Sequence, residues 1–358
     1  MDKQAALRRI QAISKAPGVS GFEDEVAALI GRYGEGLGDQ SEDAMRNVYI
    51  RRSPWREGLP SLMLDAHSDE VGFMVKAVRP NGTLEFVPLG GWLPSNVPAH
   101  RVRVRDDSGA WIPGIIASKP PHFLSEAEKK QPPEIADMLI DVGASSDREI
   151  REDYRISVAA PVTPDVQFEY FDGRDTMIGK AFDNRLGCAA IIETLRELAG
   201  SELQVNITGA FAAQEEVGLR GATVTAQTVK PDIAIAIEGS PADDTVVESY
   251  AVQTAIRKGP MLRHIDARMI TNPRFQRFAL DLARKKGIPV QEAVRTGGST
   301  NGGIIHLTGK AVPVIVIGIP VRYIHTHYGI ASYGDFEHSV QLACEIIRAL
   351  DDRVIRGF

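Results

Sequence analysis

Short apolar runs alternate with helical patterns along most of this 358-residue sequence, and this alternation restricts the possible folds more than any other feature. The apolar runs have the length of buried strands and lie at 61–67, 203–213, 232–238, 288–293 and 311–319. The helical patterns lie within 1–35 and near 184–199, 218–228, 273–286 and 336–352. Strands and helices that alternate on this scale predict an α/β fold with a mostly parallel central sheet covered by helices.

Between residues 71 and 168 the pattern changes. Short runs of alternating apolar and polar residues, such as VGFMVKAV and HRVRVRD, are separated by Gly, Pro, Asn and Asp. This is the pattern of a small all-β barrel or sandwich, with a Pro-rich loop at 119–134. We therefore predict an α/β domain formed by 1–70 and 169–358, which is interrupted by an inserted β-barrel domain over 71–168.

The composition excludes several classes of protein. The net charge is −6 and no large basic block occurs, so nucleic acid is not an expected partner. The longest apolar run, 311–319, is too short to span a bilayer, and the N-terminus lacks the apolar core of a signal peptide. Two cysteines, Cys188 and Cys344, are too few for a disulfide framework or a thiolate metal cage. A cytoplasmic protein without membrane contact is expected.

Two adjacent carboxylates follow the strand-like run 203–213. Glu215 and Glu216 stand where ligands bind in open α/β sheets, beyond the carboxyl end of a strand. Two acids at such a place repel each other and lose hydration unless a cation lies between them. A metal site explains the pair, with one carboxylate as a ligand and its neighbour as a proton acceptor. A solvated helix start is the alternative, since acids favour helix N-termini.

Four further candidate ligands lie near other predicted strand ends or helix starts, namely His67, Asp183, Glu238 and His325. Asp69 follows His67 by two residues and suits a side chain that orients a metal-bound imidazole, although an ordinary strand-end histidine fits as well. Asp183 also suits a helix N-cap. Glu238 closes an apolar strand, where packing does not explain a carboxylate.

Together these positions supply five candidate ligands and a spare acid. Oxygen and imidazole ligands without a thiolate suit Zn²⁺, Co²⁺ or Mn²⁺. Five ligands exceed the three that a single catalytic zinc commonly takes from protein. If one carboxylate bridges, the set fits two divalent metal ions about 3.5–4 Å apart.

The order of these motifs resembles the dinuclear metallo-aminopeptidases of the tetrahedral-aminopeptidase (M42) family, which includes glutamyl aminopeptidases and some members labelled cellulases. The motifs are AHSDEVG (66–72), GKAFDNRLG (179–187), AAQEEVGLRGA (212–222), IAIEGS (235–240) and RYIHTH (322–327). The resemblance covers nearly the whole chain. It implies a zinc-peptidase-like fold and homo-oligomers, from dimers to dodecamers, in which the β insertion makes contacts and limits access to the site.

The resemblance also implies a role for each matching residue. One metal ion would be held by His67, Asp183 and Glu238, and the other by Asp183 as a bridge, Glu216 and His325. Asp69 would orient His67, and Glu215 would be the general base.

Three positions depart from the family pattern. Glu238 stands where the family usually has Asp. The glycine-rich loop reads Gly-Gly-Ser-Thr-Asn (297–301) where the family usually has Gly-Gly-Thr-Asp, and Thr326-His327 replaces a frequent Ser-Pro. The first departure affects the metal site, and the other two affect substrate preference.

The sequence therefore predicts a metallo-aminopeptidase that removes N-terminal residues from peptides with a free α-amine. A metal-activated water would attack the scissile carbonyl, and Glu215 would take up its proton. Two alternatives stay open: a deacylase or aminoacylase on the same metal platform, and a metal-binding scaffold without activity. A glycosidase is not expected, because glycoside hydrolysis normally uses two carboxylates that flank the bond, without metals.

Overall fold

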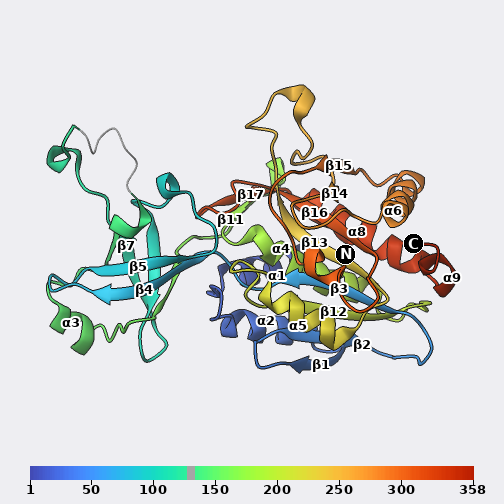
Figure 1. The fold of residues 1–358 in the computed structure, drawn as a ribbon, viewed down its shortest axis with the longest axis horizontal. Coiled ribbons are helices and arrows are strands. Elements are labelled where there is room, and N and C mark those ends of the chain that lie inside the picture. The colour runs from blue at the N-terminus through green and yellow to red at the C-terminus, as the bar shows by residue number, and fades with distance from the viewer. Residues whose placement is uncertain (127–133) are drawn as a thin grey trace.

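The structure is a computed structural model that describes residues 1–126 and 134–358. One lobe contains a large sheet with helices, and a smaller lobe contains a closed β-barrel (Figure 1). The predicted fold class is confirmed. The predicted loop 119–134 begins with the 3₁₀ turn Pro121–Phe123, and its residues 127–133 lie outside the described part of the chain.

Four parallel strands form the centre of the large sheet. In spatial order they are β12 (Asn206–Ala212), β3 (Ser61–His67), β13 (Ile233–Pro241) and β16 (Val314–Arg322). Ala212 of β12 pairs with His67 of β3, so both strands end at the same level. Because parallel strands share one carboxyl edge, the side chains that follow them converge there.

β13 is longer than the sequence indicated. Glu238 was expected to close this strand, but Gly239 and Ser240 continue the ladder by pairing with Ile319 and Pro320 of β16. The carboxylate therefore projects from a regular, hydrogen-bonded strand and not from a turn. Its backbone is correspondingly well fixed.

Shorter strands extend this sheet on both sides. On one side β2 (Val48–Arg52) pairs antiparallel with β12, and β1 (Gly38–Glu42) pairs with β2. The remaining strands are β10 (Glu169–Phe171), β11 (Thr176–Gly179), β14 (Met261–Ile265), β15 (Gln291–Val294) and β17 (Gly329–Ala331). β14 matters for the site, because it pairs antiparallel with Ile317 and Gly318 of β16 and carries Arg263, which lines the cavity described below.

Helices cover both faces of the large sheet (Figure 1). Leu62 and Leu64 of β3 pack into one core and Met63 into another, as the alternation of side chains along a strand requires. The larger core includes residues of α1 (Lys3–Lys15), α2 (Asp24–Gly34), α4 (Phe182–Glu197), α6 (Pro273–Lys286) and α8 (Tyr333–Ala349). The smaller core includes residues of α5 (Arg220–Val229) and α7 (Gly302–Ile305). The short helix α9 (Asp352–Ile355) lies near the C-terminus.

The barrel lobe is closed by six strands in the order β4-β5-β8-β7-β6-β9. Their bounds are β4 (Gly72–Val78), β5 (Leu84–Leu89), β6 (Arg101–Arg105), β7 (Trp111–Ile116), β8 (Leu139–Asp141) and β9 (Pro161–Pro164), and α3 (Asp147–Glu152) lies between β8 and β9. Val102 and Val104 are buried while the arginines of RVRVR are not, which confirms the predicted alternation.

A buried ion pair ties the barrel to the sheet. Lys180 contacts Glu70, which follows β3, and its ammonium also donates to the hydroxyl of Thr163 in β9 at 3.1 Å. No helix in the described part of the chain has the length and apolar character that a membrane span requires.

Candidate metal centre and active site

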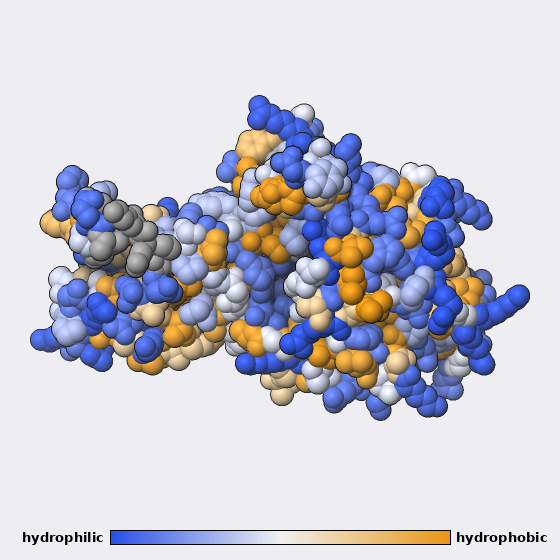
Figure 2. Space-filling view, turned by 45° about the horizontal axis from the view of Figure 1, so that its top comes forward, coloured by the Kyte–Doolittle hydropathy of each residue, from blue (hydrophilic) through white to orange (hydrophobic). Residues whose placement is uncertain are grey.

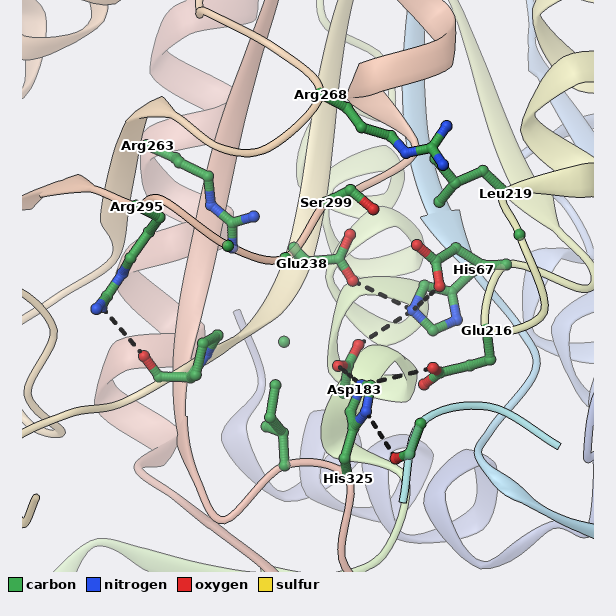
Figure 3. A pocket seen from close by; sticks show the side chains of 18 residues that line it. His67, Asp183, Glu216, Leu219, Glu238, Arg263, Arg268, Arg295, Ser299 and His325 are labelled. Atoms are coloured by element: carbon green, nitrogen blue, oxygen red, sulfur yellow. Dashed lines mark hydrogen bonds and ion pairs between the residues drawn. The ribbon is translucent and has the colours of Figure 1, made fainter. Parts of the chain in front are cut away.

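The candidate residues of the sequence meet at the carboxyl edge of the large sheet (Figure 3). A cavity of about 500 Å³ opens there. Six of the seven candidates line it, namely His67, Asp183, Glu215, Glu216, Glu238 and His325. The seventh, Asp69, is fully buried beside His67.

The first cluster is centred on His67. Its Nε2 lies 3.0 Å from Oδ1 of Asp183 and 3.2 Å from Oε1 of Glu238. Glu215 is slightly farther away, with Oε2 at 3.9 Å from the same nitrogen. The extra methylene of Glu238, relative to the expected Asp, is thus accommodated within reach of His67.

The second cluster is centred on His325. Its Nε2 lies 3.6 Å from Oδ2 of Asp183 and 3.5 Å from Oε2 of Glu216. Asp183 therefore presents one carboxylate oxygen to each cluster. That is the arrangement expected of a bridging carboxylate.

Asp183 reaches this position because its backbone is not helical. It stands in the first turn of α4, but its φ of −86° and ψ of 105° are extended. The next side chain, Asn184, donates to the carbonyl of Ile237 at 2.9 Å and accepts from the N–H of Gly239 at 3.0 Å. Asn184 thus bonds to the backbone on both sides of Glu238 and fixes the position of Glu238 relative to Asp183. The sequence interpretation assigned no role to Asn184.

Asp69 organises the turn that carries the two glutamates. Its carboxylate accepts from the backbone N–H of Glu215 at 2.9 Å and from that of Glu216 at 3.1 Å. It also accepts from the hydroxyl of Ser20 at 2.6 Å and lies 3.3 Å from Nδ1 of His67. Asp69 was expected only to orient His67, and the structure adds its hydrogen bonds to the backbone of Glu215 and Glu216.

Burial and the nearby carboxylates make it unfavourable for all the glutamates of the site to be charged at once. Burial raises the pKa of Glu216 to about 7 and that of Glu238 to about 8, and it raises the pKa of Glu215 well above its usual range. Burial lowers the pKa of His325, but its hydrogen bond to Asp183 and the charge of Glu216 outweigh burial and raise that pKa to about 9. A bound cation would stabilise the charged carboxylates and so lower these pKa values.

Oxygen and imidazole donors in this number fit divalent metal. Oε1 of Glu216 is buried and has no hydrogen-bond partner among the described residues, which leaves it available as a ligand. In the described part of the chain, ligand atoms within 4.8 Å of one another form three groups: His67–Asp183–Glu238, Asp183–Glu216–His325 and His67–Glu215–Glu216. The first two are the sets that the sequence resemblance implies.

The sequence interpretation overlooked three arginines that line the cavity, which we call the arginine wall: Arg263 on β14, and Arg268 and Arg295 on nearby loops (Figure 3). Arg263 lies 3.3 Å from Asp266, and Arg295 lies 2.8 Å from Asp243. The exposed side chain of Arg268 has no acidic partner among the described residues. The sequence signal that could have indicated Arg263 is a charged residue within the otherwise largely apolar run PMLRHI.

The remaining departures from the family pattern lie in two places. Ser299 of the glycine-rich loop lines the cavity, while Thr300 and Asn301 are buried behind it. His327 is buried and does not line the cavity. It stacks on His100 at a ring distance of 4.0 Å.

Comparison with known proteins identifies relatives along the whole chain. The family model of the M42 glutamyl aminopeptidases matches residues 47–342. A glutamyl aminopeptidase of Lactococcus lactis subsp. cremoris (strain MG1363) is 35% identical over 352 residues, which cover 98% of this chain and 96% of the relative.

Two solved structures illustrate the similarity in three dimensions. A TET aminopeptidase from the marine sediment archaeon Thaumarchaeota archaeon SCGC AB-539-E09 is 36% identical, with a TM-score of 0.94 over 99% of both chains. The TET1 peptidase of Pyrococcus horikoshii, which can assemble into a tetrahedron or a large octahedral shell, is 27% identical. Its TM-score is 0.86, with 96% of this chain and 100% of that chain covered.

Proposed function

This chain belongs to the M42 glutamyl aminopeptidase family and is a metal-dependent aminopeptidase, and from that premise we propose which residues carry the reaction and which peptides it prefers. The family that the sequence resemblance indicated is thereby confirmed. The family match and the relatives named glutamyl aminopeptidase and TET aminopeptidase support this activity, and they give no support to a deacylase or to an inactive scaffold.

We assign the two ligand sets as the geometry groups them. His67, Asp183 and Glu238 would hold one metal ion, and Asp183, Glu216 and His325 would hold the other; the grouping of their ligand atoms supports this. Bound divalent metal supplies a nucleophilic water near neutral pH and polarises the scissile carbonyl. Zn²⁺ or Co²⁺ is the proposed metal, with Mn²⁺ also compatible with the oxygen-rich set.

Glu215 is the proposed proton carrier. Its carboxylate borders the cavity, and its backbone N–H is held by Asp69, so the side chain is presented at a fixed place beside both clusters. It would take the proton of the attacking water and deliver it to the leaving amine. Unliganded carboxylate oxygens around the cavity would bind the protonated α-amine of the substrate, which restricts the reaction to N-terminal residues.

The arginine wall supports a preference for acidic N-terminal residues. Arg263 and Arg295 are each paired with an aspartate, but Arg268 adds a positive charge that has no acidic partner within residues 1–126 and 134–358. The carboxylates that line the cavity would hold the α-amine of the substrate. The side-chain carboxylate of an N-terminal Glu or Asp would then lie near the arginines. A basic side chain would face like charge.

One experiment tests the catalytic assignment. Glu215→Gln should keep two metal ions per subunit and lose about 10²- to 10⁴-fold in kcat, as expected when a general base is removed. Glu216→Gln, the neighbouring matched variant, should instead lose metal. If Glu215→Gln stays active, the assignment of the base is wrong.

A substrate panel tests the proposed preference. The metal-loaded enzyme should cleave glutamyl- and aspartyl-p-nitroanilide faster than the leucyl and lysyl compounds. Those substrates lack a C-terminal carboxylate, so any preference reports on the side chain. The C-terminal carboxylate of a peptide could also bind to the arginines. A comparison of Glu-Ala-Ala with its C-terminal amide tests this. A preference for the free acid alone would show that the arginines hold the peptide C-terminus instead.

The domain roles and assembly are also proposals. We divide the chain into an α/β domain (1–70 and 169–358) and an inserted barrel domain (71–168), and expect the barrel domain to contact other subunits and to limit access. Homo-oligomers from dimer to dodecamer are expected by analogy with the assembling TET1 peptidase. Val246 and Tyr250 are exposed on the segment around the 3₁₀ turn Ser249–Ala251, and apolar side chains of this kind suit such contacts. Apolar residues are also exposed on the barrel lobe (Figure 2). A cytoplasmic location is proposed from the sequence.

A further inference from the structure

A loop of the barrel lobe touches the ligand set of the second cluster. A Cβ built on Gly90 would lie 3.3 Å from the side chain of Glu216, and one built on Gly91 would lie 3.0 Å from Nδ1 of His325. The absence of side chains at both positions lets the backbone of this loop approach the site. The barrel therefore borders the proposed metal centre directly.

The contact with Gly91 determines how His325 faces the site. Nδ1 of His325 donates to the carbonyl of Gly91 at 2.9 Å, which turns Nε2, the nitrogen that would bind the metal ion, toward Asp183 and Glu216. His325 needs such support, since its φ of 56° lies in the left-handed region that non-glycine residues rarely adopt.

Three rings hold the barrel loop against the loop that carries His325. We call Trp92, His100 and His327 the aromatic clamp. Trp92 donates from its indole N–H to the carbonyl of Gly72 at 3.1 Å and stacks on Phe73 of the barrel core at 4.7 Å. His327 packs between the other two rings, 5.0 Å from Trp92 and 4.0 Å from His100.

We propose that the Gly90–Gly91 loop, held by the aromatic clamp, is a positioning element for the His325 side of the metal site. The barrel fixes the ring orientation of His325 and the place of its loop, so the inserted domain completes a site whose other ligands come from the large sheet. This inference rests on the proposed function, in which His325 is a ligand. It also gives a role to His327, a departure from the family pattern that the reaction itself does not use.

Gly91→Ala tests the loop contact directly, because the added methyl would push against His325 without requiring a new backbone conformation. Gly173→Ala is the matched control, since no atom of the described residues lies within 4 Å of a Cβ built there. Both proteins are loaded with Zn²⁺, dialysed against graded chelator, and analysed for metal ions per subunit. Gly91→Ala should lose one of its two ions at a chelator concentration about 10-fold lower than wild type, while the second ion stays as in the wild type.

Two variants test the clamp without touching a ligand. His327→Ala removes a ring from the stack and should weaken the same single ion, whereas His327→Phe keeps the ring faces and should retain it. Unfolding temperatures of the metal-free proteins report separately on folding. If His327→Ala fails to fold, Gly91→Ala still decides the matter.

The outcomes separate this inference from its premise. Unchanged retention of both ions in Gly91→Ala, or equal weakening of both, overturns the positioning role. If His327→Phe loses the same ion as His327→Ala, the proposed role of the aromatic clamp is refuted. A wild-type protein that binds fewer than two ions per subunit refutes the two-metal assignment itself.

Discussion

Replacement of Asp69 by Asn tests whether one buried carboxylate organises both halves of the proposed site. The side chain of Asp69 is fully buried and accepts hydrogen bonds from Ser20 and from two backbone N–H groups. Two of the donors are the backbone N–H groups of Glu215 and Glu216, which cannot reverse their direction. An asparagine presents only one accepting oxygen, so its NH₂ group must meet at least one donor.

The structure gives the size of the expected effect. A buried N–H group left without an acceptor costs about 1–3 kcal/mol of stability. Loss of the negative charge beside Nδ1 of His67 should weaken the first metal ion about 10- to 100-fold, as for other groups that orient metal-bound histidines. That factor corresponds to about 1.4–2.8 kcal/mol of binding free energy.

Asp106→Asn provides the matched control. Asp106 is also a buried acid that accepts from backbone N–H groups, those of Ser108 and Ala110, but it lies in a barrel turn that does not line the cavity. Both N–H groups at Asp106 bond to Oδ1, which an asparagine keeps, so urea denaturation of the metal-free proteins should show a smaller loss of stability for Asp106→Asn than for Asp69→Asn. Competition with a chromogenic chelator should show weaker metal binding only for Asp69→Asn. If both variants bind metal as the wild type does, Asp69 supports the fold alone and the proposed role is refuted.

Two further predictions concern charge. In the metal-free protein, stability should fall from about pH 5 to about pH 9. The folded pKa values are about 7 for Glu216, 8 for Glu238 and 9 for His325, raised by the causes given above. A group with a raised pKa stabilises the fold at a pH below its unfolded pKa. That stabilisation is lost as the pH rises through its folded pKa. Saturating Zn²⁺ should flatten this dependence in thermal unfolding scans, and an unchanged slope would contradict it. Arg268→Gln should lower kcat/KM for glutamyl-p-nitroanilide about 10-fold and leave the leucyl substrate unaffected, since hydrogen bonds to charged groups contribute about 1.5–3 kcal/mol; an equal loss for both substrates would contradict the proposed preference.

The parts of the fold that were predictable from the sequence are those with local signals. The predicted helix 273–286 has the observed bounds of α6. Asn272 caps it by accepting from two backbone N–H groups, Pro273 occupies its first position, and Gly287 ends it with a φ of 68°. The strand at 61–67 was equally clear, because its apolar run is buried on both faces.

Segments without such signals were not found. β1 has the sequence GDQSE and is mostly exposed, so no apolar pattern marks it. It is a strand only because it pairs with β2 at the edge of the sheet. β14 likewise depends on its partners β15 and β16, and with β14 the sequence interpretation also missed Arg263 and the arginine wall. Pairing between distant segments leaves little trace in either segment alone.

The same distinction applies within the site. The groups proposed to do chemistry are side chains whose type and place at strand ends made them visible in the sequence. His67 and His325 are distant in the chain and still converge, because parallel strands share a carboxyl edge. Some of the groups that position the site are backbone atoms: the carbonyl of Gly91 accepts from His325, and the N–H of Glu215 donates to Asp69. A backbone group is present at every position, so its role follows only from the folded structure.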